Sequence, residues 1–173
     1  MQPAITVRPI FSADEIARRM KVLASELRHD AGDSEIFLLG ILKGASVFLS
    51  DLMRNIQGDT SYGFIDVIRD VADETDALEI DFLSYTDIRN RDVYVLKDVV
   101  NSGVIENYLL AQLRMRYQPR RIRLVALLDK IDSRTVDVAT DFRAFSIEEG
   151  TYVGYGLETN GRYANLPFIG RLD

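Results

Sequence analysis

The sequence predicts an α/β protein with a mostly parallel central sheet that is covered by helices on both faces. Short, largely apolar segments alternate along the chain with amphipathic segments of helical period, the order that produces parallel strands joined by helices. A length of 173 residues suffices for one sizeable hydrophobic core, and no segment has the composition of a linker. We therefore expect a single domain that spans residues 1–173.

The N-terminal third of the chain shows this alternation most clearly. Ser12-Ala-Asp-Glu15 has the pattern of a capping box, and apolar residues follow at helical spacing, which predicts a helix over about 12–29. Residues 35–42 are largely apolar, as expected for a central strand with both faces covered. The Lys43-Gly44 turn and the apolar periodicity over 47–56 then predict a second helix.

The same alternation continues to the C-terminus. Apolar and β-branched runs predict strands, and one further stretch has helical spacing. We expect strands over 60–69, 78–83, 93–100 and 122–128, a helix over 104–117, and short C-terminal strands over 136–138, 142–145 and 151–156.

The composition excludes several kinds of chemistry. The chain has no cysteine, so disulfides, thiolate catalysis and cysteine-based metal sites are excluded. Its one histidine, His29, falls at the end of the first predicted helix, where a solvated side chain is the ordinary outcome. The net charge of −6 disfavours binding to nucleic acid. A cluster of arginines at a helix end, which we interpret as structural or interfacial, comprises Arg114, Arg116, Arg120, Arg121 and Arg123.

The sequence gives no indication of a membrane or export function. Its longest apolar runs are too short to span a bilayer. The N-terminus lacks a basic region followed by an apolar stretch, which is the pattern of a secretory signal. We therefore expect a cytoplasmic protein.

The most informative segment is Val93–Gly103 together with the helix that follows it. A buried strand runs through the polar turn Asn101-Ser-Gly103 into a helix, an arrangement that aims backbone N–H groups at a phosphate. Ligands of parallel sheets bind beyond the carboxyl ends of the strands. Lys43-Gly44 and Asp129-Lys130 also follow predicted strands. We therefore expect these three strand ends to form one site for a phosphorylated ligand.

Several segments, in order, resemble the hypoxanthine-guanine phosphoribosyltransferase family. The strand–turn–helix segment is similar to that family's loop for phosphoribosyl diphosphate (PRPP), and the resemblance extends over about residues 5–170. It implies a type I phosphoribosyltransferase fold with a small C-terminal hood subdomain. The other similar segments are Leu39–Ser46, Leu127–Lys130, Asp141–Ile147, Val153–Glu158 and Arg162–Gly170.

The resemblance also implies a reaction and an assembly. In this family a purine attacks C1 of PRPP and pyrophosphate bound to Mg²⁺ leaves, which yields IMP or GMP in purine salvage. The expected ligands are therefore a purine base, a nucleoside monophosphate and PRPP, with Mg²⁺ as the cofactor if the protein is active. The resemblance further implies a homodimer or a homotetramer.

Some residues of the family site are retained in this sequence. By resemblance, Lys43-Gly44 touches pyrophosphate through a backbone N–H, and Asp98 accepts a hydrogen bond from a ribose hydroxyl. Ser102 and Gly103 cradle the 5′-phosphate. Each also has an ordinary interpretation, since Lys43-Gly44 fits any strand-to-helix turn and Ser102 fits a helix N-cap.

The purine side of the site is implied in the same way. Lys130 would donate to the exocyclic oxygen of the purine, although a solvated lysine at a strand end is the ordinary alternative. Tyr152 and Val153 would lie against the base. Glu158 stands where the family has an aspartate that recognises the base and helps to hold Mg²⁺.

Two departures from the family pattern bear directly on catalysis. Asn101 stands where the family has the aspartate that takes the purine proton, and an amide cannot act as a base. General-base catalysis is typically worth about 10²–10⁴ in rate. Lys97 stands where the family has a carboxylate that accepts a hydrogen bond from the ribose. A lysine ammonium can only donate hydrogen bonds. We predict impaired purine transfer from these two positions.

Further departures affect the rest of the pocket. Ile105 replaces a hydroxyl that binds phosphate, Ala164 replaces an arginine that holds pyrophosphate, and Thr151 replaces the ring that stacks on the purine. Ser84-Tyr85 matches the pair that begins the family's mobile lid, or is simply polar sequence at a strand end. The segment that follows it is short, and a short lid excludes water poorly.

Three hypotheses follow from the sequence. The first is a diverged family member that binds a purine, a nucleotide or another phosphorylated ligand, with catalysis weak or lost. The second is an active hypoxanthine or guanine phosphoribosyltransferase in which Lys97 or Glu106 compensates. The third is a structural or regulatory subunit with a vestigial pocket.

Overall fold

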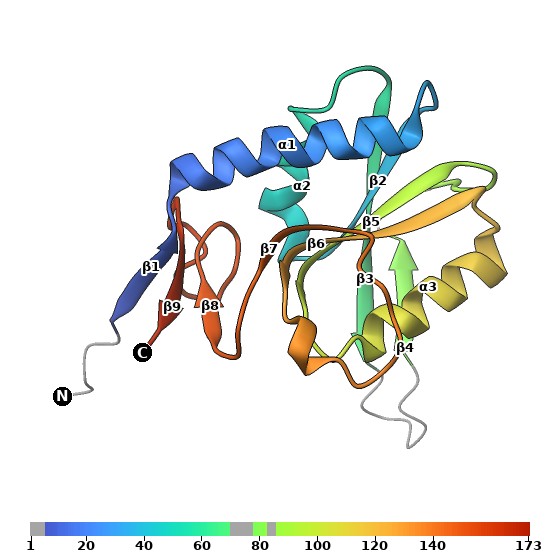
Figure 1. Cartoon of the computed structure of the whole chain (residues 1–173). Coiled ribbons are helices and arrows are strands. Elements are labelled where there is room, and N and C mark those ends of the chain that lie inside the picture. Colours follow the sequence, from blue (N-terminus) through green and yellow to red (C-terminus); the bar gives the residue numbers. More distant parts are fainter. Residues whose placement is uncertain (1–5, 70–77, 83–85) are drawn as a thin grey trace.

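The computed structural model describes residues 6–69, 78–82 and 86–173, and its elements form two sheets and three α-helices (Figure 1). The strands of the larger, central sheet lie in the order β4-β3-β2-β5-β6-β7. All neighbours in this sheet are parallel except β3 and β4, which are antiparallel. The central strands are β2 (Ile36–Ile41), β3 (Thr60–Arg69), β4 (Leu78–Phe82), β5 (Asp92–Val100), β6 (Arg121–Asp129) and β7 (Phe142–Ser146).

Helices cover both faces of the central sheet, as the sequence predicts. Alternate side chains of β5 pack into the hydrophobic cores on the two sides of the central sheet, because successive side chains of a strand point to opposite faces. Tyr94 and Leu96 pack with the buried residues of α1 (Ala13–Ala31) and α2 (Ala45–Met53). Val93 and Val95 pack with those of α3 (Val104–Tyr117). This two-faced burial confirms the predicted α/β class.

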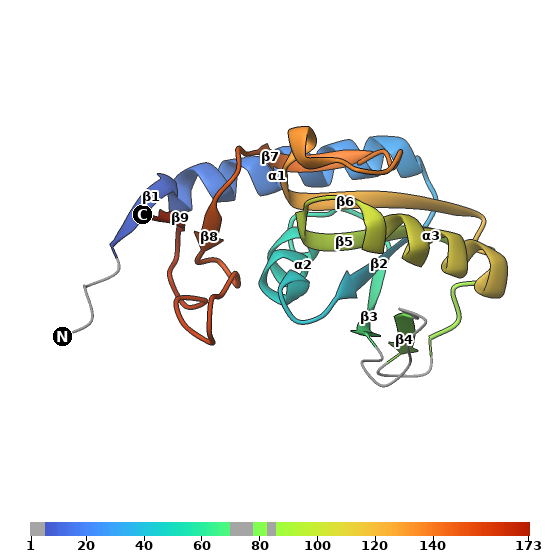
Figure 2. The ribbon, with the colours of Figure 1, turned by 90° about the horizontal axis from the view of Figure 1, so that it is seen from below.

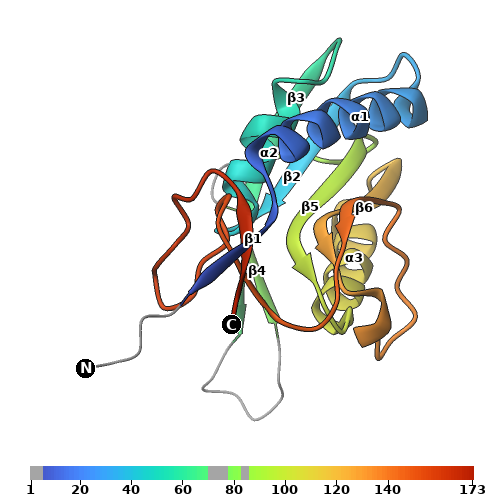
Figure 3. The same ribbon diagram turned by 60° about the vertical axis from the view of Figure 1, so that its left-hand side comes forward.

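The smaller sheet, which we call the hood, consists of β1 (Val7–Phe11), β9 (Ile169–Leu172) and β8 (Thr151–Val153), in that order. Both pairings in the hood are antiparallel. Figures 1 and 2 show the hood beside the central sheet, with α1 running from one to the other. In Figure 3 the hood lies toward the viewer, and its strands β1 and β9 come from near the beginning and the end of the chain. The predicted small C-terminal subdomain is therefore present, but an N-terminal strand completes it.

Most of the expected elements are confirmed. The capping box of α1 is formed, since the Glu15 backbone N–H donates to Ser12 Oγ over 3.3 Å and the Ser12 backbone N–H donates to Glu15 Oε2 over 2.8 Å. The prediction of a strand over 136–138 is wrong. This segment has no strand partner, and Val138 instead packs over the start of α3, with its Cγ1 2.4 Å from where a Cβ at Gly103 would lie.

The arginine cluster is largely structural. Arg120 Nε and Arg121 Nη2 each lie 2.8 Å from a carboxylate oxygen of Asp92, whose side chain is 3% exposed. Arg121 and Arg123 also pair with Asp30, which accepts a hydrogen bond from the buried Tyr94 hydroxyl. These contacts join the end of α1 to the starts of β5 and β6, on the side of the sheet opposite the strand ends.

Asp92 makes folding sensitive to acid. The hydrogen bond from Arg120, reinforced by the charges of Arg121 and Arg120, holds the pKa of Asp92 below its usual value despite burial. A depressed folded-state pKa contributes stability above the unfolded value of about 4, which is lost as the pH falls through the folded pKa. We expect Asp92→Asn to lower the free energy of unfolding by about 2 kcal/mol at pH 7.

Urea unfolding measured from neutral to strongly acidic pH checks this expectation. The wild-type protein should lose stability more steeply than Asp92→Asn below pH about 4. Asp132→Asn, at an exposed residue, is the matched control and should follow the wild type. Parallel curves for Asp92→Asn and the wild type would contradict the assigned role of Asp92.

Candidate functional site

The carboxyl ends of β2, β5 and β6 meet at one edge of the central sheet. β5 lies between the other two strands, with Gly40 opposite Leu96 and Val100 opposite Asp129. The residues that follow these strands are therefore neighbours. We call Lys43, Gly44, Lys97–Gly103 and Lys130 the strand-end site, and the expected convergence of the three strand ends is confirmed.

The turn after β2 packs tightly against the end of β5. The Leu42–Lys43 peptide bond is cis. A Cβ at Gly44 would lie 1.9 Å from Asp98 Oδ2 and 2.5 Å from its Cγ, so only glycine lets the carboxylate approach so closely. On the other side, a Cβ at Gly156 would lie 3.3 Å from the Gly44 carbonyl oxygen. The turn is thus held between the Asp98 carboxylate and the segment that follows β8.

Two lysine–carboxylate pairs lie at this turn. Lys97 Nζ lies 2.5 Å from Asp98 Oδ1, and the two side chains are 21% and 22% exposed. Lys43 Nζ lies 2.7 Å from Glu158 Oε1. One Asp98 carboxylate therefore joins the ammonium of Lys97 to the Gly44 turn. Both acidic residues that the resemblance assigns to the ligand are paired with a lysine.

The turn Asn101-Ser-Gly103 forms the start of α3, as expected. Gly103 has a φ of 82°, a left-handed conformation that favours glycine. The Val104 backbone N–H donates to Ser102 Oγ over 3.4 Å, and the Asn107 N–H donates to the Gly103 carbonyl oxygen over 2.8 Å. The Asn101 side chain is exposed at the beginning of this turn. The turn therefore leads directly into the N-terminus of α3, where the exposed residues include Val104 and Ile105.

Lys130 is a buried cation beside this loop. Its residue is 7% exposed, and its backbone N–H donates to the Val100 carbonyl oxygen over 3.0 Å. Its ammonium donates to Glu149 Oε1 and to the Gly150 carbonyl oxygen, both over 3.1 Å. The hydrogen bond from Lys130, followed by that from Ser133, lowers the pKa of Glu149. Lys130 thus ties the end of β6 to the segment that leads into β8.

Arg134 is the residue that sequence reasoning missed. Its Nη1 donates to the Asn101 carbonyl oxygen over 2.5 Å and to the Val100 carbonyl oxygen over 3.3 Å. Its Nη2 donates to Asp129 Oδ1 over 2.5 Å and to Thr140 over 2.8 Å. One guanidinium therefore clamps the main chain of the loop to a carboxylate that is 1% exposed. No local pattern marks Arg134, because its partners come from three separate segments.

The residues expected against the purine lie in the hood. Tyr152 is half-buried and its hydroxyl donates to the Glu148 carbonyl oxygen over 3.3 Å, while Thr151 is exposed. Val153 is fully buried, so only its backbone could face a ligand. Ala164 is half-buried, and its carbonyl oxygen accepts from the Gly156 N–H over 2.9 Å. The expected lid pair, Ser84 and Tyr85, lies outside the described residues.

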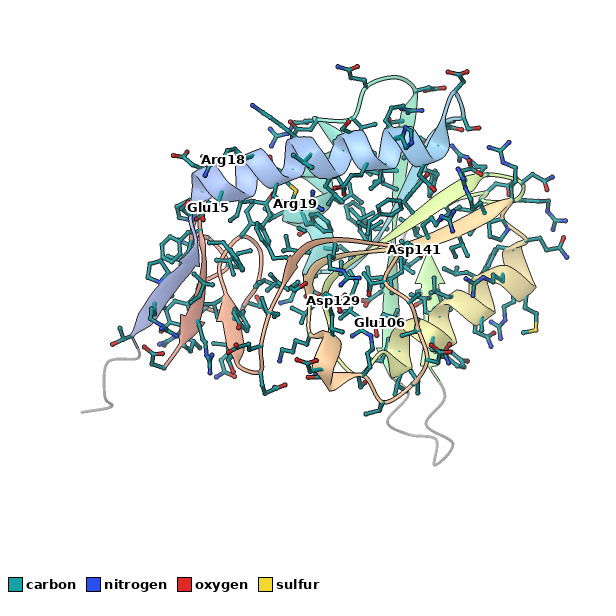
Figure 4. The ribbon with its side chains drawn as sticks, viewed as in Figure 1. Glu15, Arg18, Arg19, Glu106, Asp129 and Asp141 are labelled. Carbon is teal, nitrogen blue, oxygen red and sulfur yellow. The ribbon has the colours of Figure 1, made fainter. Side chains whose placement is uncertain are left out.

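Glu106 is a buried carboxylate next to the strand-end site (Figure 4). The buried residues of α3 are Glu106, Leu109, Leu110 and Leu113, so Glu106 lies on the side of the helix that faces the sheet. Burial raises the pKa of Glu106, and the charges of Lys97 and Arg134 oppose that rise. Glu106 is thus an acidic group of altered pKa on the first turn of the loop's helix.

The donor set of the site does not fit a divalent cation held by protein carboxylates. Mg²⁺ takes oxygen ligands, commonly from carboxylates and phosphates. Asp98 and Glu158 are each occupied by a lysine ammonium. Among the side chains that the structure describes, no three acidic, histidine or cysteine residues gather as metal ligands would.

The chain matches the phosphoribosyl transferase domain family over residues 8–160. The parallel sheet with its strand-end loop is therefore that of a phosphoribosyltransferase domain. The sequence is 33% identical to a hypoxanthine-guanine phosphoribosyltransferase of Bacillus subtilis over 165 residues, which cover 94% of this chain and 91% of the relative. This chain belongs to the hypoxanthine-guanine phosphoribosyltransferase family.

Other relatives agree with this assignment. A hypoxanthine phosphoribosyltransferase of Salmonella typhimurium is 33% identical over 178 residues, which cover 96% of each chain. The crystal structure of a hypoxanthine-guanine phosphoribosyltransferase from Bacillus anthracis, with HEPES in its active site, has a TM-score of 0.89 at 29% identity. The alignment covers 98% of this chain and 99% of that one. These relatives support purine phosphoribosyltransferase function.

No helix in the described part of the chain is long and apolar enough to cross a membrane.

Proposed function

We propose that this chain binds a purine or a purine nucleoside monophosphate, together with PRPP, and that its purine transfer is weak. The strand-end site supports binding, because Gly44, Asp98, Ser102 and Gly103, which by resemblance would contact ribose and phosphates, lie together at the strand ends. Buried Lys130 lies at the adjacent strand end, next to the hood residues that would cover a base.

The observation that carries the second half of the proposal is Asn101. Its carboxamide stands where the family has a carboxylate to take the purine proton, and an amide is not a base. The Arg134 clamp on the Asn101 carbonyl oxygen holds this part of the loop in place, so the substitution acts in an ordered site. Single-domain organisation over 1–173 and self-association as a homodimer or homotetramer are further parts of the proposal.

Calorimetry and a turnover assay test the proposal together. We expect IMP or GMP to bind the wild-type chain, and Lys130→Ala to weaken that binding by about tenfold or more through the lost charge-assisted hydrogen bond. Lys21→Ala, on the exposed face of α1, is the matched control. Formation of nucleotide from PRPP and hypoxanthine or guanine should fall well below the roughly 1–10³ per second of ordinary enzymes. Absence of nucleotide binding would refute the binding claim.

The second candidate is an active hypoxanthine or guanine phosphoribosyltransferase that makes IMP or GMP in purine salvage. Two observations favour it: relatives of that name at 33% identity, and the carboxylate of Glu106 on the first turn of α3, whose pKa is raised by burial. Glu106→Gln separates the candidates. If Glu106 supplies the missing base, this variant should lose about 10²-fold or more in turnover.

A further inference from the structure

Three of the four lysines in this chain lie at the strand-end site. Lysine is uncommon in this chain, because 17 of its 21 Lys and Arg residues are arginines. Lys43, Lys97 and Lys130 stand at the ends of β2, β5 and β6, whereas Lys21 is exposed on α1. A lysine ammonium is a compact point charge with three donors, which suits it to phosphate oxygens.

The strand-end loop is also more positive than the pattern that it resembles. Lysine in place of an acid at position 97 raises the local charge by two units, and Asn101 in place of an aspartate raises it by one unit. The remaining carboxylates, Asp98 and Glu158, are neutralised by Lys97 and Lys43 at 2.5 and 2.7 Å. With Lys130 paired to Glu149 as well, these lysine–carboxylate pairs carry no net negative charge, whereas an acidic loop would need a bound cation to accept a diphosphate.

The position of Lys97 lets it act on a ligand as well as on Asp98. Its side chain is 21% exposed, so the ammonium is partly shielded from water while still open on one side, and partial burial strengthens its electrostatic interactions. One of its three N–H groups donates to Asp98 Oδ1. The same carboxylate touches the Gly44 turn, which keeps the ammonium beside the turn that would bind pyrophosphate.

We propose that Lys97 takes the place of a divalent cation at this site, so that the chain binds a diphosphate group in its metal-free form in preference to its magnesium complex. The inference rests on the proposed function, because it assigns the ionic form of the diphosphate ligand at the same site. The magnesium complex carries two fewer negative charges and brings a second cation toward Lys97. Both effects weaken its attraction to a site that already carries lysines.

Calorimetry with inorganic diphosphate tests this inference, in metal-free buffer and in excess Mg²⁺. The wild-type chain should bind the metal-free form about tenfold more tightly. Lys97→Glu should reverse the order, and Lys97→Gln should abolish the preference. Lys21→Glu makes the same charge change on the exposed surface of α1 and should keep the wild-type order.

Amine acylation followed by mass spectrometry gives a second measurement on the unaltered chain, which remains valid if Lys97→Glu does not fold. Metal-free diphosphate should protect Lys97 from acylation and leave Lys21 reactive. Binding of the magnesium complex alone, of neither form, or of both forms without a preference would overturn the inference. In each of these cases, binding of IMP or GMP under the same conditions would leave the proposed function standing, and its loss would refute both.

Discussion

Asn101→Asp should raise the rate of nucleotide formation from PRPP and hypoxanthine or guanine by about 10²-fold or more over the wild-type chain. The variant places a carboxylate at the position that, by the resemblance, would take the purine proton. Two features of the structure make Asn101→Asp alone a sufficient test of the missing base. The Asn101 side chain is exposed, so aspartate incurs no burial penalty. The loop backbone is held by Arg134 through the Asn101 carbonyl oxygen, which the substitution does not alter.

The matched control is Asn107→Asp, which makes the same change at an exposed residue of α3 a few positions along the chain. It adds the same negative charge near the loop without placing a base at position 101, so its turnover should remain near the wild-type rate. Initial rates of IMP and GMP formation measured across pH check the result. A wild-type rate already in the ordinary enzyme range, unchanged in Asn101→Asp, would show that another group accepts the proton. The Glu106→Gln variant would then be the decisive measurement.

Arg134→Ala should lower the free energy of unfolding by about 3 kcal/mol, because it removes the main partner of a buried charge. Asp129 is 1% exposed, and its Oδ1 lies 2.5 Å from Arg134 Nη2. The substitution also removes the donors to the carbonyl oxygens of Val100 and Asn101. The loop that precedes α3 should therefore loosen, and nucleotide binding should weaken together with stability.

Arg143→Ala is the matched control for this prediction. Arg143 Nε lies 3.4 Å from the other oxygen of Asp129, but its side chain is 39% exposed and its interaction is screened by water. We expect a loss of about 1 kcal/mol or less for that variant. Guanidinium-induced unfolding compares the two proteins, and equal losses would show that Arg134 is not the principal partner of Asp129. Arg134→Lys should lose less stability than Arg134→Ala and more than Arg143→Ala. A lysine ammonium keeps the positive charge but cannot reach both the Asp129 carboxylate and the carbonyl oxygens of the loop.

Sequence reasoning succeeded where the signal is local. The capping box of Ser12 and Glu15, the apolar run that forms β2, and the Asn101-Ser-Gly103 turn all depend on neighbouring residues, and each formed as expected. The convergence of the three strand ends follows from parallel strands, so it too could be predicted. The side-chain partners at those ends could not, because Lys43 meets Glu158 and Lys130 meets Glu149, and these two glutamates flank β8 in a separate part of the chain.

The elements that sequence reasoning missed depend on partners far along the chain. Val7 pairs with Leu172, and neither segment has a local pattern strong enough to mark it as a strand. Arg134 becomes a clamp because Asp129, Thr140 and the carbonyl oxygens of the loop surround it. The error at 136–138 has a related cause, since these valines pack over Gly103 rather than along a neighbouring strand.

The hood connects strands from near the beginning and the end of the chain to the segment that pairs with the strand-end site. β9 is flanked on one side by β1 and on the other by β8, the strand from which the chain continues to Gly156 and Glu158. Removal of residues 7–11 would expose the hydrogen-bonding edge of β9 to water or to other strands. Proteolytic trimming at the N-terminus would therefore disturb the sheet that leads into Gly156 and Glu158, although every residue of the strand-end site would still be present.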